Sequence, residues 1–229
     1  MIADVGVVIV AGGAGTRAGG GELKQFRWVA GKPMLLHSVQ IFQARADVCM
    51  VIVVLPQSVV GDPPPWLFQC DTERLLLSVG GRQRSDSVRN GLEDLSADAR
   101  IVVIHDAARP LVTEAVIDRV IDAARKGTGA APGIPAADTL KRVDDNGRVI
   151  GTVDRSGLVH VQTPQAFPRD MIERAHADAY AAQVSATDDA ALCERLGMPV
   201  VVVRGSARGI KITDEADFVR AEALSILRE

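Results

Sequence analysis

The chain has 229 residues, of which 47% are hydrophobic, and its formal net charge is −3. This length and composition suit one large α/β domain over residues 1–229, with a core that needs no disulfide or metal to hold it. The weak negative charge argues against the broad basic surface that nucleic acid or an anionic membrane requires, so the expected partners are small molecules.

The cysteines and the N-terminal segment indicate the cellular compartment of the protein. Cys49, Cys70 and Cys193 are widely separated and form no C-x-x-C pair, which argues against a zinc site and favours reduced thiols. The N-terminus leads directly into an apolar strand without a signal sequence, and no apolar run is long enough to span a bilayer. We therefore expect a soluble cytoplasmic protein.

Short apolar runs alternate with amphipathic segments, which predicts a mostly parallel twisted sheet with helices on both faces, a Rossmann-like α/β fold. The predicted strands are 5–10, 48–55, 75–79, 101–104, 129–134 and 200–203. The predicted helices are 33–46, 86–95, 113–126, 168–183, 188–196 and 214–227. Thr113, Asp188 and Asp214 are the expected N-caps of three of them.

A glycine-rich loop follows the first strand. Residues 5–10 are almost entirely apolar and end in β-branched side chains, as in a buried parallel strand, and residues 11–15 then supply three glycines. Backbone N–H groups in such a loop form an anion site, and Arg17 and Lys24 add positive charge close by. The pattern predicts a nucleoside triphosphate at this loop, and a turn without a ligand is the alternative.

Two common glycine motifs fit this loop poorly. No Lys-Ser or Lys-Thr pair follows the glycines, as a Walker A loop would require. Gly13 and Gly15 supply only the first half of a dinucleotide fingerprint, and the acidic residue expected about twenty positions later is absent. A nicotinamide-dependent oxidoreductase is therefore the weakest interpretation.

The segment 105–106 is the second candidate cluster. Asp106 follows the predicted strand 101–104, at the sheet edge where doubly wound folds bind ligands, and could hold a magnesium ion that bridges phosphates. A simple cap of the following turn is the alternative. His105 has no partner at metal spacing, so we expect a packed, hydrogen-bonded histidine without a catalytic role.

The loop 80–88 joins another strand to a helix on the same predicted edge. Gly81 allows the close approach of a planar base, and Ser87 could bind the polar edge of that base. Ordinary capping of a helix N-terminus is the alternative. Arg84 could pair with a carboxylate or with a phosphate, and the sequence does not choose between them.

The region of about 138–162 departs from the alternation of strands and helices. It contains predicted strands, an Asp145-Asn146-Gly147 turn and an Arg155-Ser156-Gly157 turn, so it predicts a protruding β-arm. An isolated hairpin is only marginally stable, which favours a homodimer in which the arms are exchanged. An antiparallel extension of the chain's own sheet is the competing interpretation.

A series of sequence blocks occurs in the order AGGAGTR with KQF, GGRQRSDSV, HDAARP, ADTLKR, TVDR, QTPQAF, TDDA and IKIT. Together they span most of the chain and resemble the 2-C-methyl-D-erythritol 4-phosphate cytidylyltransferases of the non-mevalonate isoprenoid pathway. The resemblance implies a nucleotidyltransferase fold, a homodimer formed through the β-arm, and CTP as co-substrate with Mg²⁺ or another divalent cation. The implied reaction transfers CMP to the sugar phosphate, releases pyrophosphate and gives 4-diphosphocytidyl-2-C-methyl-D-erythritol.

The resemblance also implies a role for each matching residue. Arg17 and Lys24 would be the catalytic cations, and Asp106 would hold the metal. The implied nucleotide-binding residues are Ala11, Gly12, Gly13, Ala14, Gly15, Gly81, Ser87 and Ala107. The implied sugar phosphate ligands are Arg109, Thr163, Thr187 and Lys211 from one subunit, with Thr139 and Arg155 from the other.

This chemistry explains the residue types. The attacking phosphate oxygen is already an anion, so no general base is needed, and the site must instead neutralise phosphate charge. A ribitol 5-phosphate cytidylyltransferase would share these features and remains the alternative. A regulator that binds the nucleotide without reacting is the alternative from another class, and the retained Lys24, Arg17, Asp106 and Lys211 argue against it.

Overall fold

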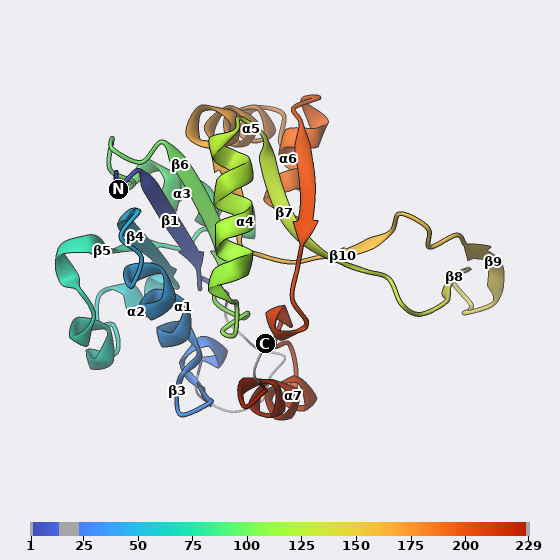
Figure 1. Ribbon diagram of the computed structural model, residues 1–229, viewed down its shortest axis with the longest axis horizontal. Coiled ribbons are helices and arrows are strands. Elements are labelled where there is room, and N and C mark those ends of the chain that lie inside the picture. The colour runs from blue at the N-terminus through green and yellow to red at the C-terminus, as the bar shows by residue number, and fades with distance from the viewer. Residues whose placement is uncertain (1, 14–22, 228–229) are drawn as a thin grey trace.

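The computed structural model describes residues 2–13 and 23–227, and its centre is an eight-stranded sheet (Figure 1). The strand order is β10-β7-β11-β6-β1-β4-β5, and β12 pairs with the other side of β7. The strands are β1 (Val5–Val10), β4 (Val48–Leu55), β5 (Leu75–Val79), β6 (Ile101–Asp106), β7 (Gly129–Pro135), β10 (Val159–Val161), β11 (Gln165–Pro168) and β12 (Val200–Arg204). Only β10 and β11 run antiparallel to their neighbours among these strands, so the predicted mostly parallel sheet is confirmed.

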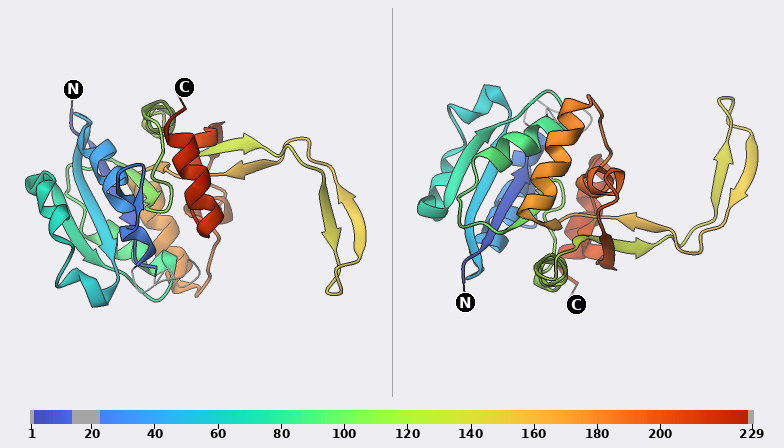
Figure 2. Two further views of the ribbon diagram at one scale, coloured as in Figure 1. Left: turned by 90° about the horizontal axis from the view of Figure 1, so that it is seen from below. Right: turned by 90° about the horizontal axis from the view of Figure 1, so that it is seen from above.

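Helices cover both faces of the sheet, as expected (Figure 2). Helices α1 and α4 pack on one face, and α3, α5 and α6 pack on the other. The longer helices are α1 (Met34–Gln43), α3 (Arg84–Glu93), α4 (Glu114–Arg125), α5 (Arg169–Ala181), α6 (Asp189–Arg195) and α7 (Glu215–Ser225). Shorter elements are β2 (Trp28–Val29), β3 (Lys32–Pro33), α2 (Gln57–Val60) and the 3₁₀ turns η2 (Lys24–Phe26), η3 (Pro65–Gln69), η4 (Thr72–Arg74) and η5 (Ala207–Gly209).

The central strands are apolar on both faces because both faces are buried. In β1, the side chains of Val7 and Ile9 join the core under α1 and α4, whereas Val8 joins the core under α3 and α5. All three are fully buried. Strands with two buried faces are expected to lack the alternation of polar and apolar residues, which is why residues 5–10 form a continuous apolar run.

The predicted helices and strands are present with modest differences at their ends, and two details are corrected. Thr113 precedes α4, but its hydroxyl makes no capping hydrogen bond and is buried without a partner among the described residues. By contrast, the Asp188 and Asp214 side chains do cap α6 and α7. Strand β6 also extends beyond the predicted 101–104 to include Asp106 itself.

The predicted arm region divides into two parts. Strands β8 (Leu140–Val143) and β9 (Val149–Val153) form a separate two-stranded antiparallel sheet, which extends away from the rest of the chain (Figures 1 and 2). The third strand of the region, β10, instead pairs with β7 in the central sheet. Residues 140–153 therefore form a projecting hairpin, residues 159–161 extend the chain's own sheet, and the exchange of arms in a homodimer stays a prediction.

The hairpin turn follows from local sequence. The Asp144 carboxylate accepts hydrogen bonds from the backbone N–H groups of Asn146 and Arg148, at 3.0 and 2.9 Å. Gly147 has a φ of +76°, a conformation in which a side chain would be strained.

Within residues 2–13 and 23–227, no helix combines the length and the apolar character needed to cross a membrane.

The close packing of α3 on the sheet gives the first testable prediction. A Cβ on Gly91 would lie 2.6 Å from Val8 Cγ1 and 3.1 Å from Val54 Cγ2. We expect Gly91→Val to lower the free energy of unfolding by about 2 kcal/mol or more, because the core is overpacked. Urea unfolding measures this change.

Gly61→Val is the matched control, since a Cβ there meets nothing within 4 Å. A loss of stability at Gly61 as large as that at Gly91 would contradict the packing argument.

Candidate active site

The Gln25 side chain holds the glycine loop after β1 in place through two hydrogen bonds. Gln25 is 4% exposed, and its Nε2 donates to the carbonyl oxygens of Ala11 and Gly13, at 2.8 and 3.3 Å. Because these carbonyls face Gln25, the N–H of Gly12, on the same peptide plane as the Ala11 carbonyl, points the other way. Gln25 had no predicted role in the site.

Part of the predicted loop lies outside the described residues. This part includes Ala14, Gly15 and Arg17, for which the resemblance implies nucleotide binding and catalysis. Gly12 and Gly13 are described and line the cavity above the loop. A Cβ on Gly12 would lie 3.2 Å from Ser87 Oγ, so the loop packs closely against the start of α3.

The loop before α3 borders the same cavity. Ser87 Oγ accepts a hydrogen bond from the Gly81 N–H at 3.1 Å and donates to the Gln83 carbonyl at 3.2 Å. Gln83 and Asp86 form a capping box, so the helix-capping interpretation of this segment is confirmed. Gly81 and Ser87 nevertheless line the cavity, together with Gly12 and Gly13 of the glycine loop.

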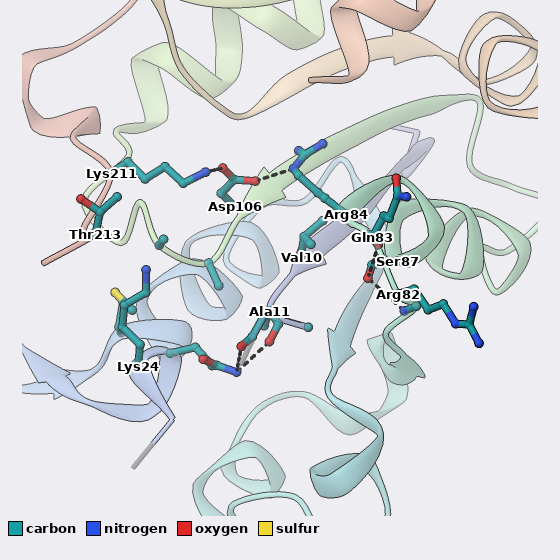
Figure 3. Close-up of a pocket in the computed structure, with 17 residues that line it drawn as sticks. Val10, Ala11, Lys24, Arg82, Gln83, Arg84, Ser87, Asp106, Lys211 and Thr213 are labelled. Carbon is teal, nitrogen blue, oxygen red and sulfur yellow. Dashed lines mark hydrogen bonds and ion pairs between the residues drawn. The ribbon is translucent and has the colours of Figure 1, made fainter. Parts of the chain in front are cut away.

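The cavity has a volume of about 410 Å³ (Figure 3). Its lining residues come from the carboxyl end of β1, the loop before α3, the end of β6, the 3₁₀ turn at Lys24 and the segment after η5. The predicted site residues that line it are Ala11, Gly12, Gly13, Lys24, Gly81, Ser87, Asp106, Ala107 and Lys211. The structure therefore brings together residues from both ends of the chain.

Lys24 approaches the cavity from the side opposite to Ser87 in Figure 3. Its ammonium donates a hydrogen bond to the Ile212 carbonyl oxygen at 2.7 Å, beside Thr213, which also lines the cavity. Lys24 is the first residue of the short turn η2, whose next residue is the buried Gln25. The same short turn thus supplies both the side chain that holds the glycine loop and the cation beside it.

A second cavity of about 240 Å³ adjoins the first. Arg109, Thr163 and Thr187, all predicted site residues, line it. Arg84, Asp106 and Lys211 line both cavities, so these three side chains form the boundary between them.

The boundary is an ion-pair network. Asp106 Oδ2 accepts from Lys211 Nζ at 2.7 Å, and Asp106 Oδ1 accepts from Arg84 Nε at 3.1 Å. Arg84 Nη1 also donates to Asp189 Oδ2 at 2.7 Å. The pairing of Arg84 that the sequence left open is thus with carboxylates, and the turn-cap interpretation of Asp106 does not match its side-chain partners.

These cations determine the ionisation of Asp106. Burial alone would raise the pKa of this carboxyl, but Arg84, Lys211 and Arg109 together hold it far below its ordinary value. Burial alone would likewise lower the pKa of the Arg84 guanidinium, whereas Asp189 and Asp106 raise it. Asp106 and Arg84 are therefore both charged at neutral pH.

His105 is a packed histidine, as predicted. It is fully buried, its Nε2 lies 3.1 Å from the Arg109 carbonyl oxygen, and its Nδ1 lies 3.3 Å from Thr163 Oγ1. Burial lowers the pKa of His105 to about 4, so the ring is neutral at pH 7.

The second cavity is bounded by residues that β11 and β6 place together. Thr163 Oγ1 accepts a hydrogen bond from the Asp106 N–H at 3.0 Å. The Arg109 guanidinium donates to the carbonyls of Gly209 and Val161, and its Nε is buried without a partner among the described residues. The remaining two predicted substrate residues, Thr139 and Arg155, are exposed on the arm and line neither cavity.

Known proteins resemble this chain over nearly its whole length. The family model described as "IspD: 2-C-methyl-D-erythritol 4-phosphate cytidylyltransferase" matches residues 5–229. The enzyme of that name from Syntrophus aciditrophicus is 41% identical over 97% of this chain and 96% of its own, and the one from Roseobacter denitrificans is 42% identical over 98% of each.

A solved structure supports the same relationship. The crystal structure of 2-C-methyl-D-erythritol 4-phosphate cytidylyltransferase from Thermus thermophilus aligns with a TM-score of 0.81 and 33% identity, over 96% of this chain and 98% of that one. The fold, the site geometry and the full-length similarity lead to one conclusion: this chain belongs to the 2-C-methyl-D-erythritol 4-phosphate cytidylyltransferase family.

Proposed function

We propose that this chain transfers CMP from CTP to 2-C-methyl-D-erythritol 4-phosphate and releases pyrophosphate. Family membership makes the chain a cytidylyltransferase. The observation that supports the proposal best is the pair of adjoining cavities with a common boundary of Arg84, Asp106 and Lys211. The proposed transfer requires CTP and the sugar phosphate to meet, and a boundary shared by two cavities would allow this.

The larger cavity is proposed to bind CTP. The backbone of Gly12 and Gly13 would face the phosphates, and Gly81, Ser87 and Ala107 would lie around the nucleoside, since all five line this cavity. Lys24 would stabilise negative charge on the phosphates from the opposite side, together with Arg17, which lies outside the described residues.

The smaller cavity is proposed to bind the sugar phosphate, with Arg109, Thr163, Thr187 and Lys211 as its ligands. One oxygen of that phosphate attacks the α-phosphorus of CTP, and the bond to the β-phosphate oxygen breaks so that pyrophosphate leaves. The nucleophile carries its own negative charge, so no side chain has to remove a proton. The neutral His105 fits this scheme, because the reaction gives it no proton to transfer.

A divalent cation is proposed to bind at Asp106. The Asp106 carboxylate is ionised and lines both cavities. Among the described residues that line the larger cavity, Asp106 is the only acidic one. The described residues contain no cluster of three or more metal-ligating side chains. One carboxylate with phosphate oxygens is a typical donor set for Mg²⁺, which would neutralise charge on the phosphates.

The arm is proposed to complete the site of a second copy. Thr139 and Arg155 are exposed, and the arm also exposes Val149 and Ile150, each 61% exposed. Apolar exposure of this kind favours burial against another molecule. A homodimer with exchanged arms would bring Thr139 and Arg155 to the partner's smaller cavity.

We also propose a cytoplasmic location. Cys49, Cys70 and Cys193 are unpaired thiols, as is usual in a reducing compartment.

Substrate choice is tested by pyrophosphate release. CTP, ATP, GTP and UTP are each combined with methylerythritol phosphate or ribitol 5-phosphate, in magnesium or in EDTA. We expect the fastest release from CTP with methylerythritol phosphate in magnesium, since the proposed metal neutralises the phosphates. Faster turnover with ribitol 5-phosphate would support the alternative enzyme, and CTP binding without any release would support the regulator.

The role of Lys24 is tested by Lys24→Ala. We expect kcat to fall by about 10²- to 10³-fold with the fold retained, by analogy with the loss of one charge-stabilising donor. Pyrophosphate release and thermal unfolding measure the two properties. Lys32→Ala is the control, because Lys32 is exposed, bonds to Gln40 and lines neither cavity. Wild-type turnover of Lys24→Ala would remove Lys24 from the mechanism.

Arm exchange is tested by mixing two inactive variants, Arg155→Ala and Lys211→Ala. With exchanged arms, each mixed dimer contains one site in which both residues are intact, so random mixing should restore about one quarter of wild-type activity. If each arm served its own subunit, every site in the mixture would lack one residue and no activity would return.

A further inference from the structure

We propose that Asp189 is a positioning residue for this reaction: it orients Arg84, and through Arg84 it keeps Asp106 correctly placed between the two cavities. The inference rests on the proposed function and assigns a role to a residue that contacts neither substrate cavity. It concerns a line of paired side chains that leads from the cavities into the protein interior, in the order Lys211, Asp106, Arg84, Asp189 and His176.

Asp189 acts at a distance from both ligands. It is 1% exposed, and it lines neither cavity, although Arg84 lines both. Its Oδ2 accepts from Arg84 Nη1 at 2.7 Å, and its Oδ1 lies 3.0 Å from His176 Nε2. Of these two side-chain partners only Arg84 lines the cavities, so the proposed effect of Asp189 on the reaction passes through Arg84.

The backbone holds Asp189 rigidly. It is the first residue of α6, and Asp188 before it caps the helix by accepting from the Ala191 N–H at 3.0 Å. Gln165 on β11 clamps this helix start from the sheet side, since its Nε2 donates to Asp188 at 2.7 Å and its Oε1 accepts from the Ala190 N–H at 3.0 Å. Side chains on such fixed elements are suited to orienting others.

The guanidinium of Arg84 is planar, so two partners determine its orientation. Asp189 holds Nη1 and Asp106 holds Nε, while Nη2 is buried without a partner among the described residues. Without the Asp189 charge, the guanidinium can rotate and bind Asp106 through two parallel hydrogen bonds, the preferred geometry for an arginine and a carboxylate. That rotation would take the Asp106 oxygen that Lys211 now uses.

Charge supports the same role. Two cations, Lys211 and Arg84, pair with two carboxylates, Asp106 and Asp189, and Arg109 adds a further positive charge near Asp106. Burial alone would raise the pKa of the Asp189 carboxyl, but Arg84 and His176 hold it below its ordinary value. Removal of the Asp189 charge makes the boundary more positive by one unit, which attracts CTP phosphates more strongly in the ground state while the reacting geometry is disturbed.

Asp189→Asn is the central variant. We expect kcat to fall by about 10- to 100-fold, in line with the usual cost of small misplacements at a reacting centre. The KM for CTP should stay unchanged or fall, because the added positive charge favours nucleotide binding. In a background of Arg84→Lys, which cannot form the two-pronged contact, Asp189→Asn should have little further effect on kcat.

His176 provides a second test that keeps both charges of the Arg84–Asp189 pair. His176→Leu removes the group that holds Asp189 Oδ1 and should lower kcat, whereas His176→Gln retains an N–H donor and should restore most of it. This pair also serves if Asp189→Asn does not fold. Asp178→Asn is the matched control, because it breaks the exposed Arg195 ion pair between the same helices α5 and α6.

The outcomes separate this inference from the proposed function. Wild-type kcat in Asp189→Asn, an equal loss of kcat in the Arg84→Lys background, or equal kcat for His176→Leu and His176→Gln would overturn the positioning role alone. Absence of pyrophosphate release by the wild-type protein with every substrate pair would overturn the proposed function and this inference with it. Thermal unfolding and CTP titration of each variant show that the folded protein is compared.

Discussion

The structure depends on the placement of one carboxylate, Asp106, between two cations. Arg84 reaches it from α3 and Lys211 from the segment after η5, so a single side chain joins parts of the chain that are far apart in sequence. Because the Asp106 N–H is also held by Thr163 Oγ1, backbone and side chain are fixed together. Without Asp106, Arg84 and Lys211 would have no shared partner at the boundary between the two cavities.

The sheet explains why these groups meet. β1 and β6 are neighbouring parallel strands, and Val10 pairs with Asp106 at their carboxyl ends. The glycine loop and the carboxylate thus leave the sheet at one edge, as expected for ligand sites in doubly wound folds. The helices on both faces bury the strands so completely that this edge is where polar groups can gather.

Local patterns made much of this predictable. The β-branched run of 5–10, its glycines and the apolar strand that ends at Asp106 are short-range signals, and the structure has the expected strands there. β11 was missed because Gln165–Pro168 is four residues long, includes a proline and lacks an apolar run. The pairing of Arg84 with Asp189 was also beyond prediction, since it joins residues 105 positions apart and depends on how α3 and α6 meet over the sheet.

Strand β11 has one further effect on the architecture. It lies between β6 and β7 but runs in the opposite direction. Its first residue therefore pairs near the last residues of β6, which allows Thr163 and Gln165 to stand beside Asp106 and Asp188. A parallel strand at this position could preserve the apolar contacts beneath the helices, but it would place those two polar side chains at the opposite edge of the sheet. The reversed direction of this one strand therefore adds polar side chains to the edge that carries Asp106, which a fully parallel sheet would not do.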